Sequence, residues 1–574
     1  MQINKYIFPV IFGSYVLLSS CGKEWLEVRP ENSVDQYSLA DKEGIEAILT
    51  GAYSMLDGVN TQFGWESASS NWLYGSIRGL EANKGTDAGD SWAGQPIITY
   101  SETAYNESLN VKWREVYEAV SRSNCVIMVT EQAMEDGTIT EEDAALFLQQ
   151  ARALRGWYHF EAWRMWNMIP YVDEDTDQKK LTNTGDIREK IIADLQEGIK
   201  LPDNMGAIGR FNGTVSKVLL AKALMQMNHD YSEALTLLSD VKANGRKPDG
   251  SQIGLAPTYG EIFDIVNRNG IESVYTVQYS VNDGSGGLNG GYGEVLNFPY
   301  KSGGSPAGCC GFFQSTQEFV NSFRTSGGLP LLDFSYNNDP VKNDQGLKPS
   351  DPFTEDTGPL DPRLDWSVGR RGIPYWDWGV HTGSDWIRDQ TYAGPYSPKK
   401  QVYKKSQEGI YTEVGNWTSG FTANGYRMIR YADVLLLLAE CQIETGDLTG
   451  ALENINLVRA RAANPCGFIM EEDGVTPAAN YQISLYPAFP DADYAREALR
   501  MERKLELGME GHRWFDLNRW GNTVEELNRI LVYEKGTPWG PNMYGNAVVG
   551  SEDITYPIPQ RQIDLSNGNL VQNR

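Results

Sequence analysis

The spacing of apolar residues in the first half of the chain predicts long helices. Between residues 108 and 133, apolar residues recur at steps of three and four, which is the period of one helix face. A second long helix is expected over 141–166, and Pro170 stops it because proline lacks the backbone donor that continues a helix. Shorter helices are predicted at about 186–200, 215–227 and 231–243.

Two stretches look like copies of one helical hairpin. The segments ALMQMNHDYSEALTLL and AECQIETGDLTGALENI align Asp230 with Asp447 and Ala234 with Ala451. Each aspartate can cap the second helix of its pair. The pattern resembles tetratricopeptide-type helix pairs, which stack because one pair cannot bury its own apolar face. We therefore predict a mainly α fold, a tetratricopeptide-like helical-pair scaffold that carries long irregular loops with a little β structure.

The character of the chain changes between residues 245 and 425. Glycine, proline, aspartate and aromatic residues dominate there, with one strand expected at 272–280 and one helix near 315–323. A long irregular stretch in a compact protein is either functional or disordered, and the many tryptophans and tyrosines argue against disorder. We predict loops that lie on the helical scaffold, followed by a C-terminal region of helices and loops over 426–574.

The N-terminus resembles an export signal. Lys5 provides a positive charge, and the apolar run 7–18 is too short to cross a bilayer core of about 30 Å as a helix. Such a run is typical of a secretory signal. It ends in Leu18-Ser19-Ser20-Cys21, which resembles the lipobox of bacterial lipoproteins. The alternative is a plain secretory signal followed by a chance cysteine.

The lipobox interpretation divides the chain into three parts. We expect residues 1–20 to be a lipoprotein signal peptide, 21–35 to be a tether lipidated at Cys21, and 36–574 to form a single domain. More than one acyl chain on this cysteine would anchor the protein stably to a membrane, as one chain alone does not. The irregular stretch 245–425 would then be a set of insertions within that domain.

Charge and composition exclude several kinds of partner. The 574 residues carry a formal net charge of -26, so the surface repels nucleic-acid phosphates, and we expect no nucleic-acid partner. With four histidines in the whole chain, we expect no metal site and no cofactor. The acidic run 173–177 has the oxygen ligands that calcium prefers. Its spacing fits no known calcium loop, so we interpret it as a solvated turn.

The remaining cysteines suggest one covalent feature. Lipidation of Cys21 leaves five cysteines, an odd number for an exported protein. Cys125 and Cys441 lie in helical patterns, where a free cysteine behaves as a small hydrophobic residue. Cys309 and Cys310 are adjacent in a glycine-rich stretch and form either a vicinal disulfide or two free thiols.

Several motifs follow one another in an order shared with a known family. Residues 152–172, RALRGWYHFEAWRMWNMIPYV, form a long predicted helix that ends in a proline, and 360–368, LDPRLDWSV, contain an Asp-Pro-Arg segment. The stretch 426–462 carries Arg430, Tyr431, Glu440, Asn456, Arg459 and Arg461. Together with the pattern Glu-Gly-x-Arg-x-x-Asp-Leu-x-Arg at 510–519, these motifs resemble the SusD/RagB-type outer-membrane nutrient-binding lipoproteins. Asp433 stands where glutamate is more usual in that family, with the charge kept.

The resemblance implies a fold, a location and a partner. It implies a mostly helical fold with four tetratricopeptide-like pairs, and a lipid anchor in the outer membrane with the body facing the cell exterior. It also implies a partner, a TonB-dependent transporter barrel of the SusC type. Members of the family are not catalytic. They capture glycans, or sometimes peptides, and deliver them to the barrel.

The loop after the Asp-Pro-Arg segment has the chemistry for sugar binding. Sugars bind flat aromatic faces through their C–H faces, and polar groups fix their hydroxyls. The candidate stacking and polar residues of this loop are Trp366, Trp376, Trp378, Trp386, Asp385 and Arg388. The alternative is that these aromatic residues form a satellite core that holds a long loop together.

In the family, the ligand surface also uses loops after the first helices and the middle glycine-rich loop. Here those regions contain Trp72 and Trp92, and then Tyr292 and Tyr300. Trp92 is the most favourable of these candidates, because the small and polar neighbours in DAGDSWAGQ leave its face open.

Two classes of function fit the sequence. A non-enzymatic glycan-binding lipoprotein, with a neutral or weakly charged glycan as ligand, is favoured by the aromatic loops, and a peptide- or protein-binding lipoprotein of the same fold is the alternative. A glycoside hydrolase is a remote alternative, because it would need two carboxylates about 5 Å or about 6.5–9.5 Å apart, for example Asp377 with Asp385 or Asp389. The sequence contains no G-x-S-x-G, H-E-x-x-H, phosphate-loop or G-x-G-x-x-G motif.

The segment ELGMEGHRWFDLNRWG, residues 506–521, raises the question of an active site. Glu510, His512 and Asp516 are residue types that do acid/base chemistry. However, Glu502, Glu506 and Glu510 recur every four residues along a helix expected to begin near 494, and like charges at that spacing repel. We therefore predict a structural network of bidentate arginine–carboxylate pairs with His512 near its edge. The available arginines are Arg503, Arg513, Arg519 and either Arg459 or Arg461.

Overall fold

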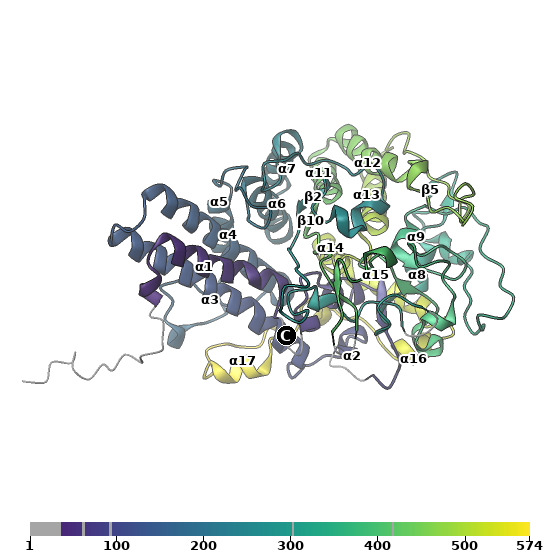
Figure 1. Ribbon diagram of the computed structural model, residues 1–574, viewed down its shortest axis with the longest axis horizontal. Coiled ribbons are helices and arrows are strands. Elements are labelled where there is room, and N and C mark those ends of the chain that lie inside the picture. Colours follow the sequence, from purple (N-terminus) through teal and green to yellow (C-terminus); the bar gives the residue numbers. More distant parts are fainter. Residues whose placement is uncertain (1–35, 60–63, 91–93, 301–303, 416–417) are drawn as a thin grey trace, which may run out of the picture.

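The computed structural model describes residues 36–59, 64–90, 94–300, 304–415 and 418–574 (Figure 1). The predicted signal peptide and tether, with Cys21, lie outside these residues, as does Trp92. Within the described part of the chain, no helix has the length and apolar character needed to cross a bilayer.

Long helices at the N-terminal end of the fold pack side by side (Figure 1). They are α1 (Lys42–Tyr53), α3 (Glu107–Glu135), α4 (Glu141–Trp166) and α5 (Arg188–Gly198). The first turns of α1, α3 and α4 are capped by side chains, as when Thr140 accepts a hydrogen bond from the backbone N of Asp143 at the start of α4. The ends of α4 agree with the sequence-based prediction, and Asn167 follows it with a φ of 60°.

The two predicted hairpins are present and lie against each other. They consist of α6 (Gly213–Ala223) with α7 (Tyr231–Asn244), and α11 (Tyr431–Thr445) with α12 (Leu448–Ala462). Asp230 accepts a hydrogen bond from Glu233 N at 3.0 Å, and Asp447 accepts one from Gly450 N at 2.9 Å. Because α7 packs on α11, the two copies form one continuous stack. The prediction of a mainly helical, tetratricopeptide-like fold is confirmed.

The C-terminal region adds further helices to this stack. They are α13 (Ala492–Leu507), α14 (Arg513–Trp520), α15 (Thr523–Glu534), α16 (Gly540–Tyr544) and α17 (Gln560–Leu565). α13 packs against both α11 and α12, and their apolar side chains form a core of their own. A larger core joins the N-terminal helices to α14 and α15, so these helices from distant parts of the sequence belong to one packed body.

Residues 245–425 form loops with short helices and strands, mostly on the side of the molecule away from the N-terminal helices (Figure 1). Their helices are α8 (Gln317–Asn321), α9 (Leu364–Ser367) and α10 (Gln390–Ala393). Strands of two to four residues pair in an antiparallel manner: β1 (Ala82–Gly85) with β3 (Phe312–Ser315), β2 (Ser273–Tyr275) with β10 (Ile429–Arg430), β4 (Thr325–Ser326) with β5 (Leu329–Pro330), β6 (Val368–Gly369) with β7 (Ser397–Pro398), and β8 (Thr412–Glu413) with β9 (Phe421–Thr422). The strand expected at 272–280 is shorter than predicted: β2 pairs with β10 only over 273–275, although Val277 N still donates a hydrogen bond to Tyr426 O at 2.8 Å beyond it.

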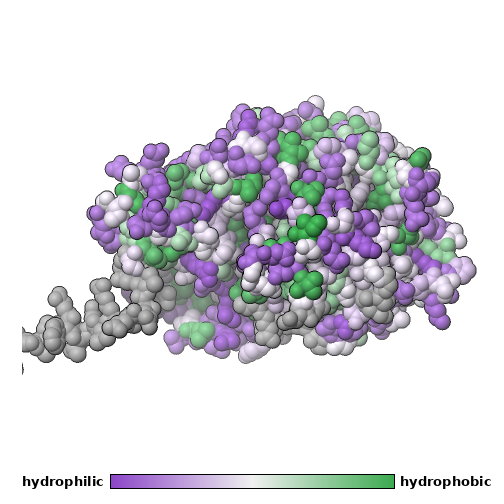
Figure 2. Space-filling model, viewed as in Figure 1, coloured by the Kyte–Doolittle hydropathy of each residue, from purple (hydrophilic) through white to green (hydrophobic). Residues whose placement is uncertain are grey.

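The surface of the molecule mixes polar and apolar residues. On the face in Figure 2, apolar residues lie in small groups separated by polar ones, rather than in one broad patch. Small satellite cores lie beneath the loops, and one of them contains Phe298, Tyr375, Trp386 and Tyr403. Long loops of this kind can therefore hold a fixed shape although their strands are very short.

Glu502 and Glu506 of α13, with Glu510 just beyond its end, belong to a buried network of ion pairs, as predicted. Five carboxylates (Glu272, Asp361, Glu502, Glu506, Glu510) meet five cations (Arg363, Lys400, Arg430, Arg459, Arg461), so the network is balanced in charge. Glu506 lies at its centre and is 0% exposed. Its carboxylate pairs with Arg363 at 3.1 Å and Arg430 at 3.0 Å, and also with Arg461. Both Arg459 and Arg461 take part, whereas the sequence left the choice between them open.

The other predicted arginines serve an adjacent set of carboxylates. Arg503 pairs with Asp516 at 2.8 Å and Asp433 at 2.9 Å, Arg519 pairs with Glu440 at 2.8 Å, and Arg513 pairs with Glu526 at 3.0 Å. His512 is partly buried at the start of α14, and burial lowers its pKa to about 4, so it is neutral near pH 7. Every carboxylate of the segment 506–521 is thus engaged by a cation, as expected of a structural network rather than an active site.

Candidate ligand-binding surface

A tight turn between residues 374 and 380 carries two of the predicted tryptophans. Tyr375 N donates a hydrogen bond to Gly379 O at 2.9 Å, and Trp378 N donates one to Tyr375 O at 3.0 Å. Trp376 has a φ of 50°, in the left-handed region. The exposed carboxylate of Asp377 accepts hydrogen bonds from the backbone N atoms of residues 405 and 406, which fixes the tip of the turn to the next segment.

Trp376 and Trp378 are both half-buried, so each keeps part of its surface at the solvent. The ring of Trp376 meets Trp366 edge-on at 5.0 Å, and Lys404 Nζ lies 5.4 Å from its centroid. Trp378 Nε1 donates a hydrogen bond to the Tyr403 carbonyl at 2.8 Å. The two indoles are therefore held in fixed positions at the edge of satellite cores, which is what a stacking platform requires.

Three other predicted tryptophans pack or form hydrogen bonds inside the fold. Trp366 is half-buried, and its Nε1 donates to the Gly467 carbonyl at 2.7 Å. Trp386 is 2% exposed in the satellite core with Tyr375, so the prediction that it stacks on a ligand is wrong. Trp72 is 1% exposed and donates to the Gly293 carbonyl at 2.9 Å, so it too offers no face to a ligand. For Trp386 the alternative interpretation, a satellite core that holds the loop together, applies, whereas Trp72 belongs to the main core.

Tyr292 belongs to a second half-exposed aromatic group. Its ring stacks parallel to that of Trp65, with centroids 6.1 Å apart and an interplanar angle of 7°. Phe421 covers another side at 5.8 Å. No hydrogen-bond partner for the Tyr292 hydroxyl occurs among the residues that the structure describes, and the residue is half-buried. Sequence reasoning missed Trp65, although its position in the loop after α1 was a usable signal.

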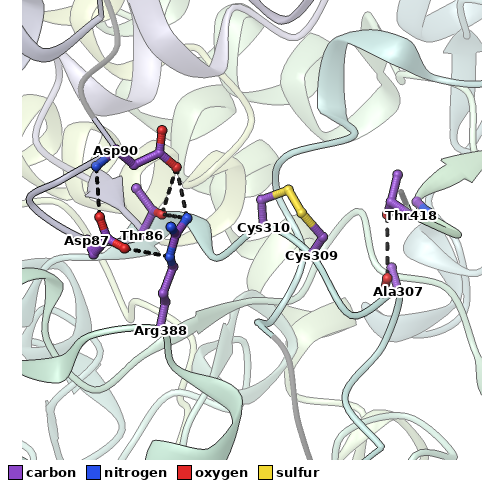
Figure 3. Close-up of a disulfide and its surroundings, with 9 residues drawn as sticks. Thr86, Asp87, Asp90, Ala307, Cys309, Cys310, Arg388 and Thr418 are labelled. Carbon is purple, nitrogen blue, oxygen red and sulfur yellow. Dashed lines mark hydrogen bonds and ion pairs between the residues drawn. A yellow bond between two sulfur atoms is a disulfide. The ribbon is translucent and has the colours of Figure 1, made fainter. Parts of the chain in front are cut away.

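Arg388 fastens two loops together and is not free for a ligand (Figure 3). Its guanidinium pairs with Asp87 at 2.6 Å and Asp90 at 2.9 Å and donates to Thr86 Oγ1 at 2.7 Å. It also lies 5.1 Å from the ring centroid of Tyr300, which is half-buried. The predicted polar contact of Arg388 with a glycan is therefore better described as a positioning role for the loop that carries these acids.

Cys309 and Cys310 form a vicinal disulfide beside this cluster (Figure 3). The backbone N of Cys310 donates to the Leu296 carbonyl at 3.3 Å, and the nearby Ala307 carbonyl accepts a hydrogen bond from Thr418 Oγ1 at 3.4 Å. The bridge thus lies in the middle loop, which these hydrogen bonds tie to Leu296 and Thr418. Asp385, the other predicted polar residue, is exposed at the start of the neighbouring short helical turn.

Comparison with known proteins decides the family. A model of the SusD family matches residues 271–574 of the chain. This chain belongs to the SusD family. It is 23% identical to a SusD-like protein of Bacteroides ovatus over 286 residues, which cover 47% of this chain and 49% of that protein. It is 24% identical to SusD-like protein P38 of Formosa agariphila over 553 residues, 92% of this chain and 93% of that protein.

The fold is also that of solved SusD-like structures. Surface glycan-binding protein A from Bacteroides thetaiotaomicron, in complex with laminarihexaose, aligns with a TM-score of 0.62 at 22% identity. The alignment covers 92% of this chain and 99% of that one. The shared fold therefore extends over nearly the whole length of this SusD-family chain.

The carboxylates near the aromatic turn of this SusD-family chain act as structural caps. Burial alone would raise the pKa of Asp377, but hydrogen bonds from Ser406 and Lys405 hold it below its usual value. Asp389 caps α10 by accepting from Thr391 N at 2.9 Å. A glycosidase acid needs a raised pKa, so Asp377 is poorly suited to that role.

Residues of the acidic run 173–177 form an ion pair and hydrogen bonds within the fold. Glu174 pairs with Arg155, which also binds Asp194 at 2.7 Å, and Asp173 is hydrogen-bonded to Thr176. Within the described ranges, no group of three or more histidine, cysteine or acidic side chains is arranged to hold a metal ion. The run therefore differs from a fully solvated turn, because one of its carboxylates joins a buried arginine.

Proposed function

We propose that this SusD-family protein is a non-catalytic glycan-binding lipoprotein of the cell surface, which captures oligo- or polysaccharide and delivers it to a SusC-type transporter. The observation that carries the binding role is the pair of fixed, half-exposed indoles of Trp376 and Trp378 at the tip of the turn 374–380. Indole faces match the C–H faces of pyranose rings and lose little entropy on binding. A solved relative of the same fold holds laminarihexaose, which supports the same class of ligand.

A binding titration with single substitutions tests the platform. Replacing Trp376 or Trp378 with alanine should weaken binding of a neutral oligosaccharide by about 1–3 kcal/mol if that residue is an anchor. Tyr105→Ala, at an aromatic residue that is 81% exposed and outside these loops, is the control and should leave affinity unchanged. Full affinity in both tryptophan variants, with unchanged melting temperatures, would show that the platform lies elsewhere.

Two measurements test which class of ligand the protein binds and whether it is an enzyme. A screen of neutral polysaccharides, charged polysaccharides and peptide digests should give binding to neutral glycans, whereas binding to peptides alone would favour the alternative of a peptide-binding lipoprotein. His512→Ala should leave glycan binding intact, because His512 lies partly buried at the start of α14, beside the structural network, and not in the turn 374–380. Hydrolysis of a bound glycan that disappears in this variant would instead indicate an enzyme.

The location and the partner rest on the sequence and the family. Cys21→Ala should release the protein from the membrane fraction, because the lipobox pattern Leu18-Ser19-Ser20-Cys21 would no longer be acylated. Retention of the variant in membranes would remove the support for the anchor. Co-purification of a transporter barrel from native membranes tests the partner, and recovery of the lipoprotein alone in mild detergent would count against it.

A further inference from the structure

A groove on the helical part of the molecule is separate from the aromatic loops. It has a volume of about 530 Å³ and shares no lining residue with the turn 374–380. Small-molecule sites usually have volumes of about 300–1,000 Å³. The groove forms where the end of α4 meets the corner between α14 and α15 and residues 554–555. Sequence reasoning missed it, because its residues come from helices predicted to serve the scaffold.

Trp163 lines this groove with an indole that has no polar partner. It is half-buried in the last turn of α4. Among the described residues, its Nε1 has no hydrogen-bond acceptor and its ring has no aromatic neighbour within stacking range, whereas Trp366 and Trp378 both donate to carbonyls. An indole of this kind has a face and a donor available for a ligand.

Carboxamides with unused hydrogen-bonding capacity surround this indole. Asn167 and Gln226 line the groove, and their side chains bond to none of the described residues. Asn522 also lines it, and its Oδ1 is buried without a partner. By contrast, Asn518 and Asn528 are engaged with backbone carbonyls at 3.0 Å and 2.8 Å. A buried acceptor without a donor is costly, so a ligand hydroxyl that satisfies it is favoured.

The charges of the groove favour an uncharged ligand. Arg164 is engaged by Glu161 and lies 3.8 Å from the ring centroid of Phe515. Glu525 is exposed at the rim. No free cation therefore faces the groove from the described residues to bind an anion. A ligand with several hydroxyls and an apolar C–H face matches an indole flanked by amides.

We propose that this groove is a second saccharide site, in which Trp163 stacks on a neutral pyranose and the free carboxamides bind its hydroxyls. The proposal shares the ligand class of the proposed function but none of its residues, so the two can fail separately. A second site on the same chain would raise the avidity for a polysaccharide long enough to reach both.

Oxidative footprinting with mass spectrometry tests the two sites in one measurement. Laminarihexaose and a panel of other neutral hexasaccharides are added, and the oxidation of Trp163, Trp376 and Trp378 is followed separately. Asn167→Gly removes one groove amide while keeping the left-handed backbone, since glycine adopts a φ of 60° without strain. Asn567→Gly is the matched control, at an exposed asparagine with a φ of 55° outside the groove.

We expect a neutral hexasaccharide to protect Trp163, and the concentration needed for half protection to rise about tenfold in Asn167→Gly but not in the control. Protection of Trp376 and Trp378 alone would overturn the groove site and leave the proposed function standing. Protection of Trp163 alone would do the reverse. Protection of Trp163 by peptides and by none of the saccharides would also overturn the proposal.

Discussion

Glu506→Gln is the sharpest test of the buried ion-pair network, because it changes the charge at the centre of the network and keeps the shape. Oε1 of Glu506 accepts from Arg430 and Arg461, and Oε2 accepts from Arg363. In glutamine one of these oxygens becomes an amide NH₂. That donor would face at least one guanidinium, which has only donors to offer. The substitution therefore leaves a cation unpaired where the side chain of residue 506 is 0% exposed.

The size of the effect follows from this burial. Removing one partner from a buried ion pair costs about 3–5 kcal/mol. The unfolding entropy of a domain this long is on the order of 1.1 kcal/mol/K at its midpoint, so a loss of about 4 kcal/mol lowers the melting temperature by about 4 °C. An exposed pair on the same helix gives the contrast, because such pairs contribute only about 0–1 kcal/mol.

The assay is thermal unfolding followed by circular dichroism, with Glu497→Gln as the control. Glu497 lies on α13 like Glu506 and pairs with Arg500 at 2.8 Å, but its side chain is 47% exposed. We expect a drop of about 4 °C for Glu506→Gln and less than about 1 °C for the control. Equal shifts for the two variants would refute the view that buried charge pairing holds α13 in place.

Three further predictions concern nearby positions. Burial would raise the pKa of Glu510, but its cationic neighbours hold that pKa at about 2. The stability that the ionised carboxylate supplies above about pH 4.3 is therefore lost as the pH falls towards 2. Glu510→Gln should flatten that part of an acid-unfolding curve. Burial raises the pKa of Glu534 to about 8, so the folded state keeps a proton that the unfolded chain releases above about pH 4.3. Thermal melting should therefore show Glu534→Gln gaining stability over the wild type between about pH 4.3 and 8, and a constant difference would contradict this. Gly511→Ala should sharply reduce the yield of folded protein, because its Cβ would lie 1.8 Å from Ser70 O, whereas Gly521→Ala, at a φ of 72° in open space, should fold.

The helices of the scaffold could be predicted closely from the sequence, because nearby capping and helix-stopping residues determine where each helix begins and ends. The predicted bounds of α4 agree with the structure, and the aspartates at 230 and 447 cap the helices that were expected. The arginine–carboxylate network could also be predicted in outline, because acidic residues four positions apart need cations between them. Its individual pairs could not, since Glu272, Arg363 and Arg430 come from distant parts of the chain.

Which of the loop tryptophans are buried could not be predicted from the sequence. In a helix the period tells which face is buried, but the stretch 364–403 has no such period. Trp386 and Trp376 have similar neighbours in sequence, yet one is buried against Tyr375 and the other is half-exposed. Trp163 was overlooked for the opposite reason. It lies in a regular helix, where an apolar residue is usually core, and its neighbours Met165 and Trp166 are indeed core, but Trp163 itself is only half-buried and lines the groove.

The network and the aromatic turn are connected through the ends of one loop. Arg363, just before α9, is bound by Glu502 and Glu506, and Lys400, just after β7, is bound by Glu510 at 2.7 Å. Both ends of the stretch 364–399 are thus fixed to the α13 region by buried charges, which explains how strands of two residues can hold the turn 374–380 in place. It follows that a change at the tip of the turn should alter ligand affinity with little loss of stability. A change at either anchor should reduce both, because the turn would lose the support that orients its indoles.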